Sequence, residues 1–266
     1  MNSDAGLPAP LPSMNCLRWT ESGSVGRITL DRPTRLNALS AELLAELVAL
    51  CGWLHSRADI RVVVVIGEGR AFSAGFDLGD FAAPASGNPR DGADLGRLAT
   101  DALTNVPQLT IAAVRGRCIG GGAVLVAACD LRVASEGALF SIPEVDLGIP
   151  LAWGGIPRLV RELGPAVTKE LVLTCRPFTA NEAKSLRWIN TVVAEDELER
   201  HVDELATSLA TKPAYALRAT KAHVNAVTEE LVGTGRSVQD ADSLVYAMRD
   251  PESRAASMKY LEARRK

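Results

Sequence analysis

Residues 116–130 read GRCIGGGAVLVAACD, and this stretch carries the first information about the fold. Three consecutive glycines stand directly before an apolar run that ends at Cys129. Glycines that open a helix leave its first N–H groups accessible at the positive end of the helix dipole. A tight turn with close helix packing would also select glycine. The stretch predicts a strand, a turn and a buried helix, with a possible anion or oxyanion site at the turn.

The neighbouring segments alternate between strand and helix patterns. Val62 to Ile66 and Ile111 to Val114 are apolar runs typical of strands that are covered on both faces, and Leu131 to Ala134 is expected to form a third strand. Ser40 can cap a helix whose leucines recur at helical spacing as far as Leu54. Strands that alternate with helices predict an α/β layered core.

The second half of the chain changes to one helix pattern after another. Thr179 and Glu182 have the spacing of a capping box, and residues 197–209 and 251–264 are expected to form further helices. At about 150 residues per domain, 266 residues permit one large domain or two small ones. We expect a flexible N-terminal tail over residues 1–14, an α/β core over 15–200 and a helical C-terminal region over 201–266.

Composition excludes several classes of function. Lys and Arg number 29 against 32 Asp and Glu, so no global positive charge attracts nucleic acid. The longest glycine-free apolar run, Ala123 to Cys129, is far shorter than the roughly 20 residues that span a membrane. Five cysteines, an odd number without a Cys-x-x-Cys pair, predict neither a disulfide framework nor a metal site. With no pattern of a secretory signal at the N-terminus, a cytoplasmic location is expected.

Common catalytic motifs are absent from the sequence. It contains no dinucleotide-binding Gly-x-Gly-x-x-Gly after a strand, no phosphate-binding P-loop and no His-Glu-x-x-His. Ala71 precedes Ser73 where the nucleophile motif of serine hydrolases would need glycine. Nucleotide phosphoryl transfer, zinc proteolysis and serine hydrolysis are therefore not supported.

A second turn that contains glycine follows the strand at Val62 to Ile66, in residues 71–78, which read AFSAGFDL. If its N–H groups converge with those of the triple glycine, two donors from separate loops can hold one carbonyl oxygen. Such a pair of donors would stabilise an enolate.

Taken together, these motifs resemble the crotonase (enoyl-CoA hydratase/isomerase) family over roughly residues 17–265. The resemblance rests on Arg32-Pro33, Leu36-Asn37-Ala38-Leu39, residues 71–78, Gly116, the three glycines, Cys129-Asp130, Phe140, Pro143-Glu144 and Gly148. It implies an α/β fold, a crotonase-like spiral of ββα turns, whose helical C-terminal region serves trimerisation. It also implies a homotrimer or dimer of trimers that binds an acyl-CoA thioester, with coenzyme A present only as part of the substrate and no separate cofactor.

The resemblance also implies roles for individual residues. The backbone N–H groups of Phe76 and Gly121 would form the oxyanion hole, and Glu144 would transfer the proton. Tyr260 resembles a family position that helps to close the CoA site of a neighbouring subunit. Contacts to CoA, with Arg35 as a candidate for phosphate charge, are implied for Arg35, Leu36, Ala74, Asp77 and Leu78.

One departure from the family pattern bears on the reaction. Hydratases of the family resemble one another in using two glutamates, but here Val124 occupies the first position and Glu144 the second. One carboxylate can move a proton from the α to the γ carbon, whereas hydration must also position a water. The further acids of dienoyl-CoA isomerases are missing at Val124 and Ala152, and Asp146 is an alternative second acid.

The sequence thus predicts an acyl-CoA enzyme that stabilises a thioester enolate in fatty-acid metabolism. The favoured reaction is isomerisation of a 3-enoyl to a 2-enoyl thioester, with enoyl-CoA hydration as a close variant. A catalytically silent acyl-CoA binding or carrier protein is the alternative from another class, and it would have no need of Glu144.

Overall fold

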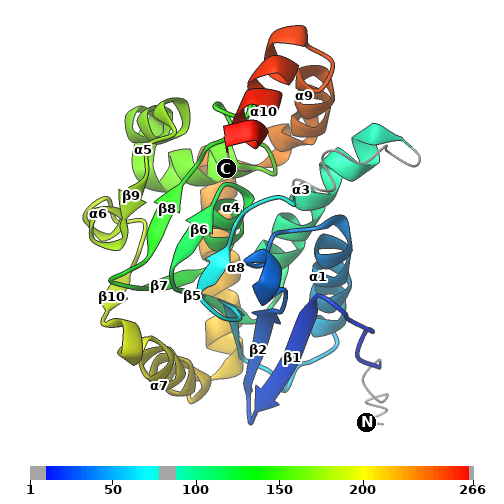
Figure 1. Cartoon of the computed structure of the whole chain (residues 1–266). Helices are drawn as coiled ribbons and strands as arrows, with labels where there is room; N and C mark the ends of the chain where they lie inside the picture. The colour runs from blue at the N-terminus through cyan, green and yellow to red at the C-terminus, as the bar shows by residue number, and fades with distance from the viewer. Residues whose placement is uncertain (1–9, 78–87, 264–266) are drawn as a thin grey trace.

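The computed structural model describes residues 10–77 and 88–263. Its strands form two sheets, which Figure 1 shows side by side. The larger, six-stranded sheet has the order β1 (Leu17–Ser22), β2 (Val25–Leu30), β3 (Val62–Gly67), β5 (Leu109–Val114), β7 (Leu131–Ser135), β10 (Thr191–Val193). The smaller, four-stranded sheet has the order β4 (Ala71–Ser73), β6 (Arg117–Ile119), β8 (Leu139–Ser141), β9 (Phe178–Thr179).

Each turn of the chain adds one strand to each sheet before a helix follows. β3 and β4 lead to α3 (Pro89–Asn105), β5 and β6 lead to α4 (Gly121–Ala127), and β7 and β8 lead to α5 (Gly155–Thr174). Strands β3, β5 and β7 are parallel neighbours, as are β4, β6 and β8. The predicted spiral of ββα turns is confirmed.

The remaining helices lie before and after these turns. They are η1 (Pro33–Arg35), α1 (Ala41–Leu54), α6 (Ala180–Ser185), η2 (Glu195–Glu197), α7 (Leu198–Ala210), α8 (Ala214–Val232), η3 (Gly235–Gln239), α9 (Asp240–Ala247) and α10 (Pro251–Ala263). The Ser40 hydroxyl caps α1, because its oxygen accepts from the Leu43 N–H at 3.2 Å. Thr179 caps α6 in the same way through the Glu182 N–H.

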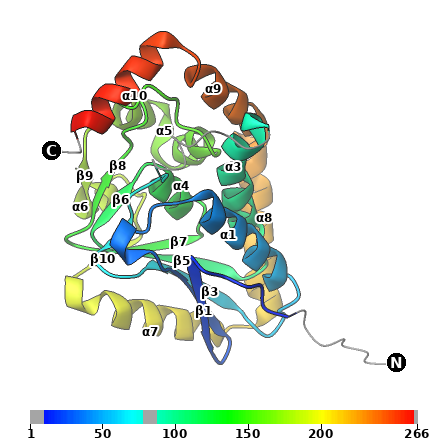
Figure 2. The ribbon, with the colours of Figure 1, turned by 45° about the vertical axis from the view of Figure 1, so that its right-hand side comes forward.

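Strand β3 demonstrates why the core has two halves. Every residue of β3 is buried, and its side chains alternate between the two faces of the sheet. Val63 and Val65 join the cluster that contains the leucines of α1, whereas Val62, Val64 and Ile66 pack against α7 on the opposite face. Figure 2 shows α7 along one face of the sheet with α1 and α4 beyond the other. The prediction of strands covered on both faces is confirmed.

Helix α7 spans the expected boundary between residues 200 and 201. Its buried side chains, Leu198, Val202 and Ala206, cover the larger sheet. Helices α8, α9 and α10 follow it, and α10 passes above the small sheet (Figure 1). No helix within residues 10–77 and 88–263 is both long and apolar enough to cross a membrane.

Candidate active site

Three segments of the candidate site follow three neighbouring parallel strands. Gly75 and Phe76 come after β4, the triple glycine comes after β6, and Glu144 comes after β8. The register pairs Ser73 with Cys118 and Cys118 with Phe140. The carboxyl ends of these strands therefore lie together, at the edge where α/β proteins commonly bind ligands.

The three glycines that open α4 each contact a different part of the site. Gly120 has φ +51°, and a Cβ there would lie 2.4 Å from Oε1 of Glu144. A Cβ on Gly121 would lie 2.3 Å from the indole of Trp153, and one on Gly122 would lie 2.9 Å from Cβ of Ser73. All three distances are too short for a side chain, so glycine is required at each position for close approach.

The loop that contains Phe76 lies close to this turn. Gly75 has φ +88°, and a Cβ built on it would lie 2.8 Å from the Ile119 carbonyl oxygen and 3.8 Å from the Gly121 nitrogen. The segment around Phe76 therefore lies against the start of α4. Within the described part of the chain, the N–H groups of Phe76 and Gly121 donate no hydrogen bond. Two adjacent free amides can accept the negative charge that develops on a carbonyl oxygen.

Glu144 is a buried carboxyl group with an unused oxygen. Its side chain lies against Gly120, and Oε2 has no hydrogen-bond partner among the described residues. Burial raises the pKa of Glu144 to about 7, while a hydrogen bond from its own backbone N–H acts in the opposite direction. A carboxyl group with this pKa can both accept and return a proton near neutral pH.

A small cavity joins Glu144 to the two loops. Its volume is about 50 Å³, enough for one or two water molecules. It is lined by Ala74, Gly75, Phe76, Ile119, Gly120, Pro143, Glu144, Leu147, Ile149 and Tyr260. Tyr260 comes from α10 of the same chain, so the structure places it beside its own Glu144. The Ser257 hydroxyl holds α10 there by donating to the Leu147 carbonyl at 2.5 Å.

The residues implied in CoA binding gather beside Phe76, with one exception. The Ala74 N–H donates to the Leu36 carbonyl at 2.8 Å. Asp77 is buried and accepts from Arg32 at 2.9 Å, and from Arg35 at 3.5 Å. The Arg35 side chain is 61% exposed, so its charge remains available to a ligand phosphate. Leu78 lies outside the described residues.

Buried polar side chains fix this corner of the site. The Asn37 amide group donates to the carbonyls of Glu68 and Ala71 at 2.9 and 2.8 Å. The Ser73 hydroxyl donates to the Asn37 carbonyl at 2.8 Å and accepts from the Gly75 N–H at 3.1 Å. These bonds hold the loop that contains Leu36 against the loop that contains Phe76.

The positions that carry further acids in other family members are apolar and buried here. Val124 is 2% exposed and Ala152 is 7% exposed, and neither lines the cavity of Glu144. A Cβ on Gly155 would lie 2.9 Å from the Val124 side chain, so the start of α5 packs directly against it. Asp146 is exposed and also does not line the cavity. Glu144 is thus the acid among the described residues that line it.

The sequence pattern missed Trp153, which occupies the apolar side of the oxyanion turn. Its indole and the Phe76 ring meet edge to face with centroids 5.8 Å apart. The tryptophan itself gives no signal of this role, because the two glycines that make room for it, Gly96 and Gly121, come from distant parts of the sequence. Gly96 lies in helix α3, more than 50 residues before Trp153.

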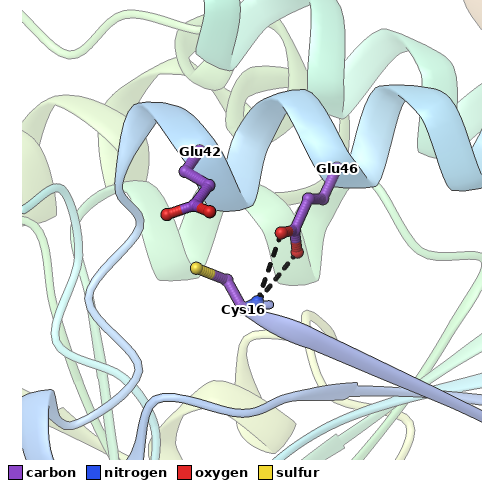
Figure 3. Close-up of side chains that lie close together, drawn as sticks. All are labelled: Cys16, Glu42 and Glu46. Carbon is purple, nitrogen blue, oxygen red and sulfur yellow. Dashed lines mark hydrogen bonds between the residues drawn. The ribbon is translucent and has the colours of Figure 1, made fainter. Parts of the chain in front are cut away.

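A separate cluster of possible metal ligands lies between β1 and α1 (Figure 3). It consists of Cys16, Glu42 and Glu46. The Glu46 carboxylate accepts from the N–H groups of Asn15, Cys16 and Leu17 at 2.6 to 3.3 Å. Burial, and then the nearby charges of Glu46 and Glu42, raise the pKa of the Cys16 thiol, whereas a metal ligand must lose that proton. The geometry fits a carboxylate that fastens the start of β1 to α1.

Comparisons with known proteins agree with this architecture. Residues 20–266 match the enoyl-CoA hydratase/isomerase family. The chain is 32% identical over 213 residues to a short-chain-enoyl-CoA hydratase of Clostridium acetobutylicum, covering 80% of this chain and 82% of that protein. It is 35% identical over 224 residues to the peroxisomal Δ3,5-Δ2,4-dienoyl-CoA isomerase of Arabidopsis thaliana, covering 79% and 80%.

Solved structures extend the comparison to three dimensions. An enoyl-CoA hydratase from Mycobacterium avium subsp. paratuberculosis K-10 has the same fold, with a TM-score of 0.86 at 24% identity over 93% of this chain and all of that one. A protein from Thermobifida fusca YX classed with the enoyl-CoA hydratases, solved in complex with CoA, is 34% identical with a TM-score of 0.77, over 88% of this chain and 95% of that one. The chain therefore belongs to the enoyl-CoA hydratase/isomerase family.

Proposed function

We propose that this chain binds acyl-CoA thioesters and moves the double bond of a 3-enoyl thioester to the 2 position. The observation that carries the proposal is that Glu144 is the one acid among the described residues that line the cavity, while Val124 and Ala152 are apolar and buried. The Thermobifida fusca relative solved with CoA supports the thioester class. The dienoyl-CoA isomerase among the relatives supports double-bond migration as a reaction of this fold.

The reaction needs one base and one oxyanion site. Ionised Glu144 takes the proton from the α carbon, the C–H electron pair becomes the new carbon–carbon double bond of an enolate, and negative charge moves to the thioester oxygen. The N–H groups of Phe76 and Gly121 would hold that oxygen; losing one such donor typically costs about 100-fold to 1,000-fold in rate. The enolate then collapses, the 3,4 double bond shifts, and protonated Glu144 returns the proton to the γ carbon.

Burial of Glu144 suits this sequence of steps. The carboxyl must be ionised to begin and protonated in the middle, and a pKa of about 7 makes both forms accessible at neutral pH. CoA would bind along the surface formed by Arg35, Leu36 and Ala74 over the buried Asp77, with the exposed Arg35 guanidinium near its phosphates. No cofactor beyond the CoA portion of the substrate is part of the proposal.

Hydration of a 2-enoyl thioester is the second candidate, because one relative is named a short-chain-enoyl-CoA hydratase. In that reaction Glu144 would have to orient the water and also serve as the proton donor. A silent acyl-CoA carrier is the third candidate, but it offers no reason for an unpartnered buried carboxyl oxygen beside two free amides. We also propose a trimer or dimer of trimers and, from five free buried thiols, a cytoplasmic location.

A panel of 3-enoyl-CoA and 2-enoyl-CoA thioesters tests the three candidates. In ordinary water, isomerisation leaves the mass of the substrate unchanged, whereas hydration adds the mass of one water. In heavy water, the isomerised product gains deuterium when the enolate exchanges its proton. We expect 3-enoyl thioesters to give 2-enoyl products. Predominant 3-hydroxyacyl products would replace the isomerase with a hydratase, and tight binding without any turnover would establish the carrier.

A further inference from the structure

Trp153 stands in a strained backbone conformation directly before α5. Its φ is +61°, a value that a bulky residue rarely adopts, and the following Gly154 has φ +69°. The side chain is nevertheless 8% exposed and packed into the protein. Strain of this kind persists only where the surroundings hold it, and it occurs preferentially at functional sites.

Two glycines on different helices make room for the indole. A Cβ on Gly96 of α3 would lie 1.9 Å from Cε2 of Trp153, and a Cβ on Gly121 of α4 would lie 2.3 Å from Cζ3. The indole therefore fills the space between α3 and the oxyanion turn. Any side chain at either glycine would expel it.

Polar groups from three helices lock the Trp153 backbone. Its carbonyl accepts from the Thr100 hydroxyl at 2.9 Å and from Nη1 of Arg158 at 3.1 Å. Arg158 is 1% exposed and is itself held by Asp101 at 2.8 Å. The Gly154 N–H donates to Asp240 of α9 at 2.8 Å. The indole is consequently a fixed wall, because its backbone cannot move without breaking buried hydrogen bonds.

We propose that Trp153 is a specificity-determining residue that ends the acyl pocket and restricts this chain to short acyl groups. The inference rests on the proposed function, in which the thioester oxygen lies at the N–H groups of Phe76 and Gly121. The indole contacts Gly121 and the Phe76 ring, so it bounds the apolar side of that position. Further along the chain, Val124 and Leu151 pack against Gly155, at 2.9 Å from the position of a Cβ there.

The test compares saturated acyl-CoA binding and enoyl-CoA turnover for chains of four, six, eight and ten carbons. Binding is measured by calorimetry and turnover as kcat/KM. The wild type should lose affinity and kcat/KM beyond four carbons. Trp153→Leu should raise the ratio of eight-carbon to four-carbon kcat/KM at least tenfold, because each methylene that becomes buried is worth about fourfold in affinity.

Trp53→Leu is the matched control. Trp53 is also nearly buried, but it belongs to α1 and packs edge to face against Trp19, away from the residues that line the cavity. Its loss should leave the chain-length ratio unchanged. If Trp153→Leu does not fold, Trp153→Phe keeps an aromatic ring of smaller volume and should extend the range to six carbons.

The two proposals can fail separately. If the wild type turns over eight-carbon and four-carbon substrates equally well, or if no Trp153 variant changes the ratio, the inference about Trp153 is wrong while the isomerase stands. If no substrate is turned over but saturated four-carbon CoA binds best and Trp153→Leu removes that preference, the inference stands and the proposed reaction is wrong.

Discussion

Replacing Glu144 with glutamine should stabilise the protein while it removes activity. Burial raises the pKa of Glu144 from its ordinary value of 4.5 to about 7. Between these values the folded protein holds a proton that the unfolded chain has released, so the stability contributed by this group is complete below pH 4.5 and is lost as the pH rises through 7. At about 1.4 kcal/mol for each tenfold change in proton affinity, ionised Glu144 costs about 3 kcal/mol at about pH 8.

Glutamine has the same shape and cannot ionise. The free energy of unfolding of Glu144→Gln, minus that of the wild type, should therefore rise by about 2.5 kcal/mol between about pH 5 and pH 8. Over the same range wild-type kcat/KM should increase with an apparent pKa near 7, because the ionised form is the base. The variant should lose at least about 100-fold in turnover at every pH, while its affinity for a saturated acyl-CoA changes little.

Urea unfolding at the two pH values measures the stability, and isomerisation of a 3-enoyl-CoA measures the activity. Asp146→Asn provides the matched control, because this exposed carboxyl lies two residues further on and does not line the cavity. The reasoning would be refuted by a stability difference that does not depend on pH. Near-wild-type turnover in Glu144→Gln would refute the assignment of the base.

Two further predictions concern the ligand surface and the assembly. Arg35→Gln should weaken binding of acyl-CoA by up to about fivefold, because an exposed cation contributes up to about 1 kcal/mol to a phosphate. Binding of the matching pantetheine thioester should not change. Arg70→Gln, at an exposed arginine directly before β4, is the control, and an equal loss for both ligands would exclude a phosphate contact. Sedimentation at micromolar concentration should give a trimer or dimer of trimers, and a wild type that remains monomeric would contradict this prediction. Leu231→Glu should weaken the assembly, because Leu231 and Val227 expose 77% and 58% of their surface on α8.

Long, regular patterns in the sequence predicted the central strands β3, β5 and β7 of the larger sheet and helix α1. Val62 to Ile66 is recognisable as a strand because every position is apolar, and α1 is recognisable because Ser40 and the leucines agree. The strands of the smaller sheet β4, β6 and β8 have three residues each, too few for a period to be visible. Their existence is a consequence of pairing with one another, which no local pattern contains.

The site was predictable where a backbone requirement selects one residue type. Gly75, Gly120 and Gly121 occupy positions that admit no Cβ, so the turns could be found from glycine alone. Glu144 could be assigned only through the resemblance, because a single glutamate has no pattern. Trp153 could not be found, since its importance depends on Gly96 in α3. Tyr260 lines the cavity of its own chain, and its expected part in closing the CoA site of a neighbouring subunit stays a prediction.

The ββα spiral also determines when the site can exist during folding. Its three segments follow β4, β6 and β8, each from a different turn of the chain, and they become neighbours only through pairing of residues far apart in sequence, such as Ser73 with Cys118. Contacts between distant residues form slowly because long loops must close first. A partly folded chain can thus contain α1 and other locally determined helices without an oxyanion hole, and the free amides of Phe76 and Gly121 meet Glu144 only when the last strands of the small sheet have paired.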